Sequence, residues 1–416
     1  MAVIQQFLFN GGGCNNDSMP TNEYFKGGNG ASGQSMGNQV DVGDGRIIVS
    51  AFPQNNQSNS GPRIFDLDGS NEVVMDRSSD SIWYSPDSGY SNSSYLSSGF
   101  GRMVAVSRDG SNKVAIGAHI WPTAYGLAPK RSVGLLSWWD SDGTNGTYQD
   151  TYDWTILDYQ GESVDIRDNM VMGSSPWDGT GSGTSRSAPI VQYGSVYFYE
   201  FDGTLIQKLE APWSPVVDGD NFGTSVRFGE TKILITSDRA GTNATVSVYD
   251  FSRNHEVDIV NPSNASDGFG GLGGGFSVDT NAVAEHKGKI YIGAAYNDTQ
   301  ATDAGVLYKY DVDGTLESTV YAPSAAASDL FGHSVAVGGG RIFVGAPGRN
   351  SNTGAVIVYD LNFNHIGTLT ASDASSGDKF GFSVAYGQGK LVVGAPTRNT
   401  NVGGAYVYDT PTNYGC

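Results

Sequence analysis

The chain has 416 residues and a formal net charge of −19 at pH 7, with 43 acidic and 24 basic side chains. No stripe rich in Lys and Arg interrupts this acidity, so we expect no nucleic-acid partner. No stretch approaches the ~20 consecutive apolar residues of a membrane-spanning helix, which argues against membrane insertion. Glycine accounts for 58 residues, and 22 Tyr, 18 Phe and 7 Trp supply a core, so the composition indicates a globular protein with many turns.

The N-terminal region holds one apolar run, residues 2–9, which predicts a lone strand within residues 1–10. It lacks the basic start and long apolar core of a signal peptide, so we expect a protein that stays in the cytoplasm or leaves by another route, such as a particle released by lysis. Residues 11–35 are rich in Gly, Asn and Ser and predict a connector. The two cysteines, Cys14 and Cys416, are too few for a disulfide framework or a zinc site, and a terminal disulfide and two unpaired thiols both remain open.

From residue 36 onward, a frame of four short strands recurs and predicts one domain over residues 36–416. The clearest copies lie at 329–360 and 379–409, where runs of β-branched and aromatic residues alternate with turns of Gly, Asn and Pro. The fifth copy is expected to start at the pair Gly275-Phe276. Repeats begin near residues 36, 100, 160, 222, 274, 331 and 380. Four short strands per unit at this spacing are typical of a β-propeller.

The last repeat lacks a fourth strand, because only seven residues follow Asp409. The lone strand in residues 1–10 fits this gap, and pairing of the two chain ends would leave no open edge in the ring. We therefore predict an all-β fold, a seven-bladed β-propeller of four-stranded antiparallel blades in which the N-terminal strand closes the last blade. In this arrangement Cys14 and Cys416 follow opposite ends of paired strands and lie on opposite faces.

The two clearest repeats each open with a Phe-Gly pair and carry a Gly-Ala-Pro triplet after the second strand. These motifs are Phe331-Gly332 with Gly345-Ala346-Pro347, and Phe380-Gly381 with Gly394-Ala395-Pro396. They resemble FG-GAP repeats, which occur in integrin α-subunit propellers and in many bacterial and viral proteins. The resemblance implies a seven-bladed propeller, in agreement with the repeat count. Integrin-type repeats often carry a D-x-D-x-D-G calcium loop between the first two strands, but the corresponding turns here lack its three carboxylates, so we expect no cofactor and no metal.

Two acidic patterns have structural explanations. The turns Asp66-x-Asp68-Gly69, Asp140-x-Asp142-Gly143 and Asp311-x-Asp313-Gly314 offer two carboxylates each, whereas calcium takes about six to eight oxygens, so they predict hairpin turns. A second set precedes the blade openings and is expected to accept hydrogen bonds from backbone amides of the entering turn. Its members are Asp220, Asp267, Asp329 and Asp378.

Signals for catalysis are weak, and we expect no enzyme. Residues 33–37 match G-x-S-x-G, but this motif needs a strand before it and a helix after it, and here it ends a Gly-rich connector. The five histidines are scattered, without metal-ligand spacing or the order of a catalytic triad. Paired carboxylates for glycoside cleavage at the central channel stay open, because only geometry can test them.

The lengths of the connections point to one face of the ring. The turns between strands one and two are mostly tight, whereas long segments occupy residues 79–99, 119–132, 174–193 and 212–221 and by strand direction share a face. Aromatic residues on long loops above a rigid scaffold are the usual composition of a recognition surface. The predicted binding residues are Trp83, Tyr84, Tyr90, Tyr95, Trp121, Tyr125, Trp177 and Trp213.

These features favour a non-enzymatic structural or recognition propeller in a virus particle, a phage tail or surface component that contacts other virion proteins or the host surface. The alternative is an exported adhesion or glycan-binding propeller at the cell surface, with the aromatic loops stacking on sugar rings or meeting a host receptor. A hydrolase with carboxylates at the channel is the third hypothesis. The fold itself hosts many functions and does not choose among them.

Overall fold

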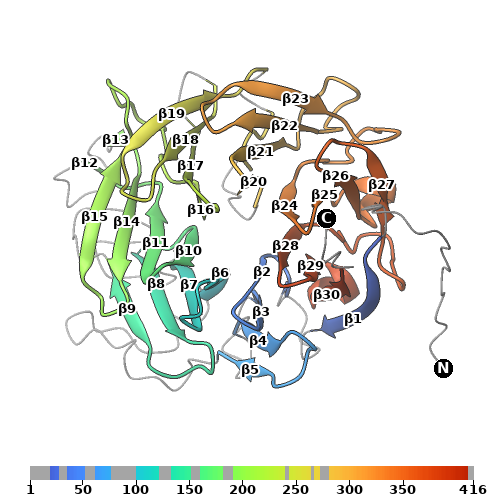
Figure 1. The fold of residues 1–416 in the computed structure, drawn as a ribbon, viewed down its shortest axis with the longest axis horizontal. Coiled ribbons are helices and arrows are strands. Elements are labelled where there is room, and N and C mark those ends of the chain that lie inside the picture. Colours follow the sequence, from blue (N-terminus) through green and yellow to red (C-terminus); the bar gives the residue numbers. More distant parts are fainter. Residues whose placement is uncertain are drawn as a thin grey trace, which may run out of the picture.

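The computed structural model describes residues 19–27, 35–51, 61–75, 100–120, 133–150, 160–180, 191–238, 243–263, 267–271 and 281–410. These residues form seven four-stranded antiparallel sheets and one small two-stranded sheet. The seven larger sheets stand as blades around a central axis, in chain order (Figure 1). The structure therefore confirms the predicted seven-bladed β-propeller.

The strands of each blade follow one another outward from the axis, except in the last blade, where the outermost strand comes from the N-terminal region. Blade one comprises β2 (Val40–Gly43), β3 (Arg46–Val49), β4 (Arg63–Asp66) and β5 (Val73–Val74), and blade two comprises β6 (Phe100–Val106), β7 (Lys113–Ile120), β8 (Val133–Asp140) and β9 (Thr147–Asp150). Blade three comprises β10 (Val164–Arg167), β11 (Met170–Ser175), β14 (Ser195–Glu200) and β15 (Leu205–Glu210), and the hairpin of β12 (Gly179–Thr180) and β13 (Val191–Gln192) lies between its second and third strands. Blade four comprises β16 (Ser225–Phe228), β17 (Ile233–Ser237), β18 (Thr245–Tyr249) and β19 (His255–Val260).

Blade five comprises β20 (Val283–His286), β21 (Lys289–Ala294), β22 (Val306–Asp311) and β23 (Leu316–Val320). Blade six comprises β24 (Ser334–Gly338), β25 (Arg341–Ala346), β26 (Ala355–Asp360) and β27 (His365–Leu369). Blade seven comprises β28 (Ser383–Gly387), β29 (Lys390–Gly394), β30 (Gly404–Asp409) and β1 (Thr21–Gly27). Two single turns, α1 (Arg349–Asn352) and α2 (Arg398–Asn401), follow the second strands of the last two blades.

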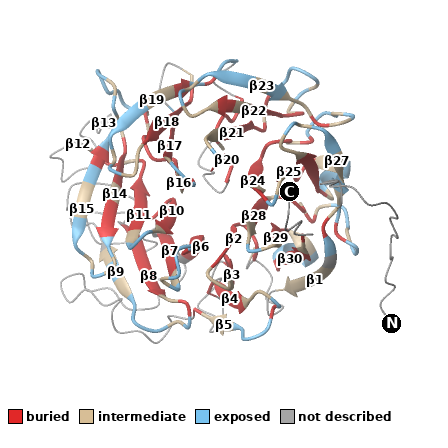
Figure 2. Cartoon of the chain, viewed as in Figure 1, coloured by how far each residue is buried: buried red, intermediate tan, exposed pale blue. Residues whose placement is uncertain are grey.

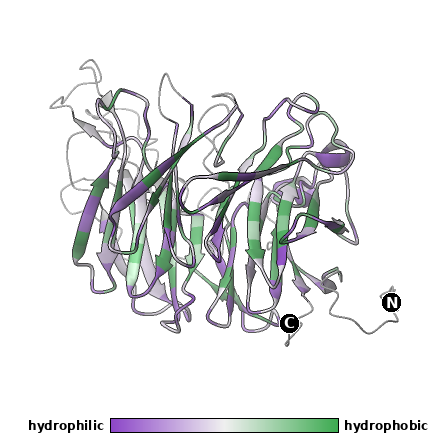
Figure 3. Ribbon diagram, turned by 45° about the horizontal axis from the view of Figure 1, so that its top comes forward, coloured by the Kyte–Doolittle hydropathy of each residue, from purple (hydrophilic) through white to green (hydrophobic). Residues whose placement is uncertain are grey.

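Burial decreases from the axis to the rim. In blade six, β25 is buried throughout, whereas β27 is exposed or half-buried along its whole length. The same gradient is visible around the ring (Figure 2), and hydrophobic residues alternate with hydrophilic ones along many strands (Figure 3). Blades pack face to face, so the inner strands are covered on both sides and read as continuous apolar runs, while the outer strands keep one polar side.

We call the end of the ring that carries the one–two and three–four turns the lower face. The two–three and four–one connections lie at the upper face. Antiparallel strand order fixes this division, because successive strands of a blade run in opposite directions. The strands that flank the long segments predicted to share one face all end at the upper face on the side of those segments.

The dipeptide that opens each blade ends in a glycine in the left-handed region, and its first residue is buried in every blade for which that burial is described. Gly332 and Gly381 have φ of +90° and +86°, and the phenylalanine before each of them is completely buried. The Gly381 N–H donates to the carbonyl of Gly394 on the second strand at 3.1 Å. A side chain other than hydrogen would be strained at this φ and would press on the neighbouring blade. The Phe-Gly half of the repeat motif is thus explained by backbone geometry and burial.

Blade five opens at a different residue pair from the one that the sequence predicts. Its opening pair is Phe269-Gly270, and the Gly270 N–H reaches the carbonyl of Gly293 at 2.8 Å, a separation of 23 residues against 13 between Gly381 and Gly394. Ten extra residues therefore separate the opening pair from β20. The predicted start at residues 275–276 lies outside the described residues.

The ring is closed by an N-terminal strand, as predicted, but the strand is β1, which pairs antiparallel with β30 from Thr21 opposite Asp409 to Gly27 opposite Gly404. Residues 21–27 belong to the predicted connector, so the placement of the closing strand in residues 1–10 was wrong. The predicted strand itself lies outside the described residues. An outer strand is half-exposed, and the alternating polar sequence TNEYFKG suits that position better than a continuous apolar run.

Because the closing strand is β1, the reason for predicting Cys14 and Cys416 on opposite faces no longer holds. Cys14 precedes β1 rather than following the closing strand, so strand direction no longer separates it from Cys416. Both cysteines lie outside the described residues.

Side chains of β1 fix the closure on both sides of the strand. The Phe25 ring packs on Tyr406 with 4.9 Å between centroids, and the Arg398 guanidinium lies 4.2 Å from the centre of the Phe25 ring. On the same side, the Tyr408 hydroxyl donates to Glu23 at 2.8 Å, and on the opposite side the Tyr24 hydroxyl donates to the Leu67 carbonyl at 2.5 Å. β1 therefore occupies its blade as a packed strand with specific side-chain partners.

Candidate functional site at the axis and the upper face

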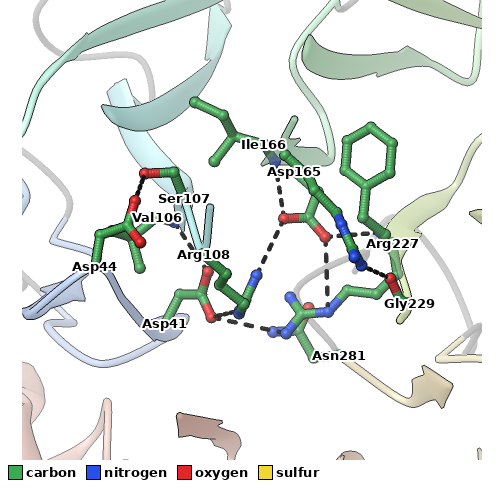
Figure 4. Close-up of polar contacts among 12 residues, drawn as sticks. Asp41, Asp44, Val106, Ser107, Arg108, Asp165, Ile166, Arg227, Gly229 and Asn281 are labelled. Carbon is green, nitrogen blue, oxygen red and sulfur yellow. Dashed lines mark hydrogen bonds and ion pairs between the residues drawn. The ribbon is translucent and has the colours of Figure 1, made fainter. Parts of the chain in front are cut away.

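Four charged side chains from the first four blades meet across the central axis (Figure 4). Asp41 on β2 and Asp165 on β10 supply the carboxylates, and Arg108 after β6 and Arg227 on β16 supply the cations. We call this group the axial quartet. Its formal charges cancel, because it contains two carboxylates and two guanidinium groups.

Both arginines face both carboxylates. Arg108 forms a close ion pair with Asp41, and its other terminal nitrogen lies 3.7 Å from Asp165. Arg227 lies 3.7 Å from Asp41 and 3.8 Å from Asp165. Each carboxylate therefore faces both guanidinium groups, and the quartet links blades one to four.

The two carboxylates are removed from solvent. Asp41 and Asp165 are each 0% exposed. Burial raises the pKa of Asp165 above its usual value, although Arg227 and Arg108 oppose this rise. Burial alone would lower the pKa of Arg108, but Asp41, Asp165 and Asp44 together raise it. The carboxylates of the quartet are buried beneath partly exposed arginines, so the quartet offers no exposed pair of carboxylates to a substrate.

The carboxylates also pair backbone groups at the inner edges of the blades. Asp41 accepts a hydrogen bond from the Val106 N–H at 2.9 Å, and Asp165 accepts one from the Phe228 N–H at 2.8 Å. An inner strand has no neighbouring strand on its axial side, so its N–H groups need side-chain partners. Sequence reasoning missed these residues, and their common place five residues after a blade-opening residue, 36 or 160, was the signal available.

A second polar bridge crosses the axis. Gln39 accepts the Val104 N–H at 2.8 Å and donates through its amide to Asn281 at 3.2 Å. Gln39 belongs to blade one, whereas Asn281 lies directly before β20 of blade five. The Asn281 carbonyl in turn accepts the Val335 N–H of blade six at 2.7 Å. Blades on opposite sides of the ring thus meet through side chains at the axis.

The lower face is tied together by hydrogen bonds between neighbouring one–two turns. Asp44 of blade one accepts the Gly110 N–H of blade two at 2.9 Å, and Gln388 of blade seven accepts the Gly45 N–H of blade one at 2.7 Å. Glu230 of blade four likewise accepts a hydrogen bond from a backbone N–H of blade five. The side chains of these turn residues therefore form contacts between neighbouring blades.

The Asp-Gly turns are hairpin turns, as predicted. In the turn of blade one, the Ser70 N–H donates to the Asp68 carboxylate at 2.8 Å and the Gly69 N–H donates to the Asp66 carbonyl at 2.8 Å. The same side-chain bond forms from Thr144 to Asp142 at 2.9 Å. Among the described residues, no group of three or more His, Cys, Asp or Glu side chains is arranged to hold a metal ion.

The acidic residues before the blade openings accept hydrogen bonds within their entering loops. Asp220 accepts the Val217 N–H at 2.9 Å, and Asp378 accepts the Ser375 N–H at 2.9 Å. Asp329 does the same for Ala326 at 3.1 Å. These bonds confirm the predicted structural role at three of the four positions.

At the fourth position, Asp267, the described residues supply two side-chain partners. It accepts a hydrogen bond from the Asn297 amide at 2.7 Å and a close one from the Ser263 hydroxyl. The equivalent backbone donor, residue 264, lies outside the described residues, so the predicted backbone partner of Asp267 stays a prediction.

Two of the eight predicted binding residues lie in the described part of the upper face. Trp177 is half-buried and lies between β11 and β12. Trp213 packs edge-on against Phe222, with ring centroids 5.9 Å apart, and donates from its indole nitrogen to Asp220 at 2.9 Å. Trp213 therefore holds its own loop onto blade four. Outside the described residues lie Trp83, Tyr84, Tyr90, Tyr95, Trp121 and Tyr125.

One serine, histidine and aspartate group exists, and its order differs from that of a hydrolytic triad. Asp258 lies between the other two members, accepting the Ser247 hydroxyl at 2.7 Å and meeting the His255 ring at 2.9 Å. A triad needs the histidine between serine and aspartate, so that the imidazole takes the serine proton. Ser247 is also buried, so this arrangement serves the packing of blade four.

Comparisons with known proteins agree with the fold. The family model described as FG-GAP repeat matches residues 315–359 and 363–408. A comparison with curated proteins found no match. No helix in the described part of the chain is long and apolar enough to cross a membrane. Each match runs from the outer strand of one blade, β23 or β27, through the third strand of the next. The chain is thus a seven-bladed β-propeller that carries FG-GAP repeats in its C-terminal blades.

Proposed function

We propose that this propeller is a non-enzymatic recognition scaffold whose upper face contacts another macromolecule, and that it serves as a component of a virus particle. The FG-GAP propeller suits protein interaction and recognition in general. The virion assignment rests on the Gly-, Ser- and Asn-rich all-β composition and the one-sided distribution of long connections. A phage tail or a particle surface is the location that we propose.

The observation that carries the recognition proposal is the contrast between the axis and the upper face. At the axis, the carboxylates Asp41 and Asp165 are buried and matched by arginines. At the lower face, short turns are bonded to one another. The long connections lie at the upper face, and loops on a rigid scaffold are where binding residues are usually found.

The test of the virion assignment is quantitative peptide mass spectrometry of density-purified particles from the source, beside the soluble fraction. We expect a fixed copy number in the particles, and that number will indicate the symmetry site. A protein found in the soluble or cell-surface fraction and absent from the particles contradicts the virion assignment. The recognition proposal survives that result, because it concerns the upper face and not the location.

A glycan-binding propeller is the second candidate, and the half-buried Trp177 beside the acidic Asp178 supports it. Asp178 accepts the Tyr197 hydroxyl at 2.8 Å and pairs with Lys208 at 2.8 Å, so an aromatic side chain lies next to an ordered polar group. Glycan-array binding that is lost in Trp177→Ala and kept in Trp213→Phe would support this candidate. Equal glycan binding by Trp177→Ala and the unmodified protein would show that Trp177 is not part of a glycan-binding site.

A further inference from the structure

We propose that the loop of residues 211–220, which enters blade four at the upper face, is a preformed protein-docking element. Its exposed pair Val216 and Val217 would insert into an apolar recess that is flanked by Lys or Arg on a partner protein. This inference deepens the proposed recognition function and rests on it. The argument uses the anchoring of the loop, its comparison with two sister loops, and the charge around it.

The loop is held in one shape by its ends. The Asp220 carboxylate accepts both the Val217 N–H and the Trp213 indole N–H, each at 2.9 Å. The Trp213 ring packs edge-on against the fully buried Phe222 that opens the blade. Asp220 itself is 1% exposed, so these bonds are shielded from water. A loop that is ordered before binding loses little conformational entropy when a partner arrives.

Despite this anchoring, two aliphatic side chains point outward. Val216 is 37% exposed and Val217 is 40% exposed. Each side chain leaves more than a third of its surface exposed, and because the two are adjacent on an ordered loop they present one apolar contact to a partner. The loop fold does not require valine, because its hydrogen bond at residue 217 comes from the backbone.

Two sister loops of the same chain provide an internal comparison. Asp329 and Asp378 accept the N–H three residues earlier, as Asp220 does, so all three loops share one anchor. At the positions of Val216 and Val217, the sister loops carry Ala325 with Ala326, and Ala374 with Ser375. The same backbone geometry is therefore built without large apolar side chains elsewhere in the ring, which separates the valines from the needs of the fold.

The charge around the valines indicates the chemistry of the partner. Asp218 and Asp238 are exposed close to the loop, and Asn221 donates to Asp238 at 3.3 Å. Lys208, which precedes the loop, is already paired with Asp178. An acidic rim around two aliphatic side chains fits a basic rim around an apolar recess.

The first experiment places a photo-reactive benzoyl-phenylalanine at position 217 of the full chain in its natural source, with the same probe at 326, 375 and 177 as comparisons. We expect one dominant protein adduct from position 217 and none from 326 or 375. Equal adducts from the sister loops, or an adduct from 177 with none from 217, overturn the inference and leave the proposed function standing. No adduct from 217 or 177 counts against both.

The second experiment measures affinity for the captured protein by calorimetry. Val216→Ser with Val217→Ser should weaken binding at least about tenfold, while Ala325→Ser with Ala326→Ser should leave it unchanged. Raising NaCl from about 50 mM to about 300 mM should weaken binding several-fold, because exposed charges are screened. An affinity that is unchanged by the valine replacements, with the thermal midpoint also unchanged, overturns the inference, and so does an affinity that is insensitive to salt.

Discussion

The glycine of the blade-opening pair is the residue on which each blade depends most directly. At Gly381 φ is +86°, and an added Cβ would lie 2.4 Å from the Ala355 carbonyl oxygen. Gly377 offers a matched comparison four residues earlier, because its φ is +93° but an added Cβ would meet nothing within 4 Å. The two positions separate the cost of a left-handed conformation from the cost of a clash.

We therefore expect Gly381→Ala to lower the free energy of unfolding by roughly 3 kcal/mol or more, and Gly377→Ala by about 1 kcal/mol, since only the first adds a collision between blades. Urea unfolding of both variants measures this difference. Equal losses of unfolding free energy in the two variants would mean that the left-handed backbone conformation alone accounts for the need for glycine at position 381.

A second prediction at this scale concerns pH. The folded-state pKa of Asp165 is raised by burial, so its protonated form is favoured by folding. The stability from this group is fully present below the usual aspartate pKa of about 4 and is lost as pH rises through the raised value. Asp165→Asn removes this titration. The unfolding free energy of the unmodified protein should fall relative to that of the variant between about pH 4 and the raised pKa, and urea titrations across this range that run parallel would contradict the assignment.

Among the elements, the closing strand and the fifth blade show what the sequence pattern can and cannot reveal. Most strands were predicted, because apolar β-branched runs between Gly and Asn turns mark inner strands. β1 was missed because half of an outer strand faces water, which leaves TNEYFKG without an apolar run. The opening of blade five was misplaced because Gly275-Phe276 precedes Ser277-Val278 and imitates the start of a repeat. The axial quartet was missed because an aspartate within a strand carries no sign of what it faces.

The closing strand yields a prediction of its own. Phe25 packs against Tyr406 and lies under Arg398, so Phe25→Ala should lower the unfolding free energy by about 2–4 kcal/mol. It should also speed proteolysis near residues 21–27, because the strand would detach more often. Tyr148→Ala on the outer strand β9 is the control, since that side chain is 41% exposed and should change stability by less than about 0.5 kcal/mol. Equal effects of the two changes would show that β1 is not held by its side chains.

At the scale of the whole molecule, the two halves of the ring are held at the axis by different means. Asp41, Asp165 and Arg227 occupy one position of the inner strand in blades one, three and four, and blade two has Ala105 there but supplies Arg108 from the following turn. The equivalent positions in blades five to seven are Ala284, Ala336 and Ala385. Small side chains let the inner strands approach closely, while the quartet spans its gap with paired charges. A buried charge that loses its partner is costly, so the first half should respond as a unit when one member is removed.

Hydrogen exchange tests this division. Arg108→Met leaves Asp41 and Asp165 with Arg227 alone, and we expect a loss of about 3–5 kcal/mol in unfolding free energy. Amide protection should fall first on the inner strands β2, β6, β10 and β16. Protection on β24 and β28 should persist. Lys232→Met breaks a partly exposed pair with Glu256 and should cost less than about 1 kcal/mol. Uniform loss of protection around the ring would contradict two distinct halves.

The pairing of β1 with β30 also sets the orientation in which the ring can be mounted. Thr21 lies opposite Asp409, and strand order places both of these residues at the lower face. The segments that precede β1 and follow β30 therefore depart from the same rim position, on the side opposite the long connections. If the propeller were attached to a support through either segment, its lower face would point toward the support. The loop of residues 211–220 at the upper face would then point away from it.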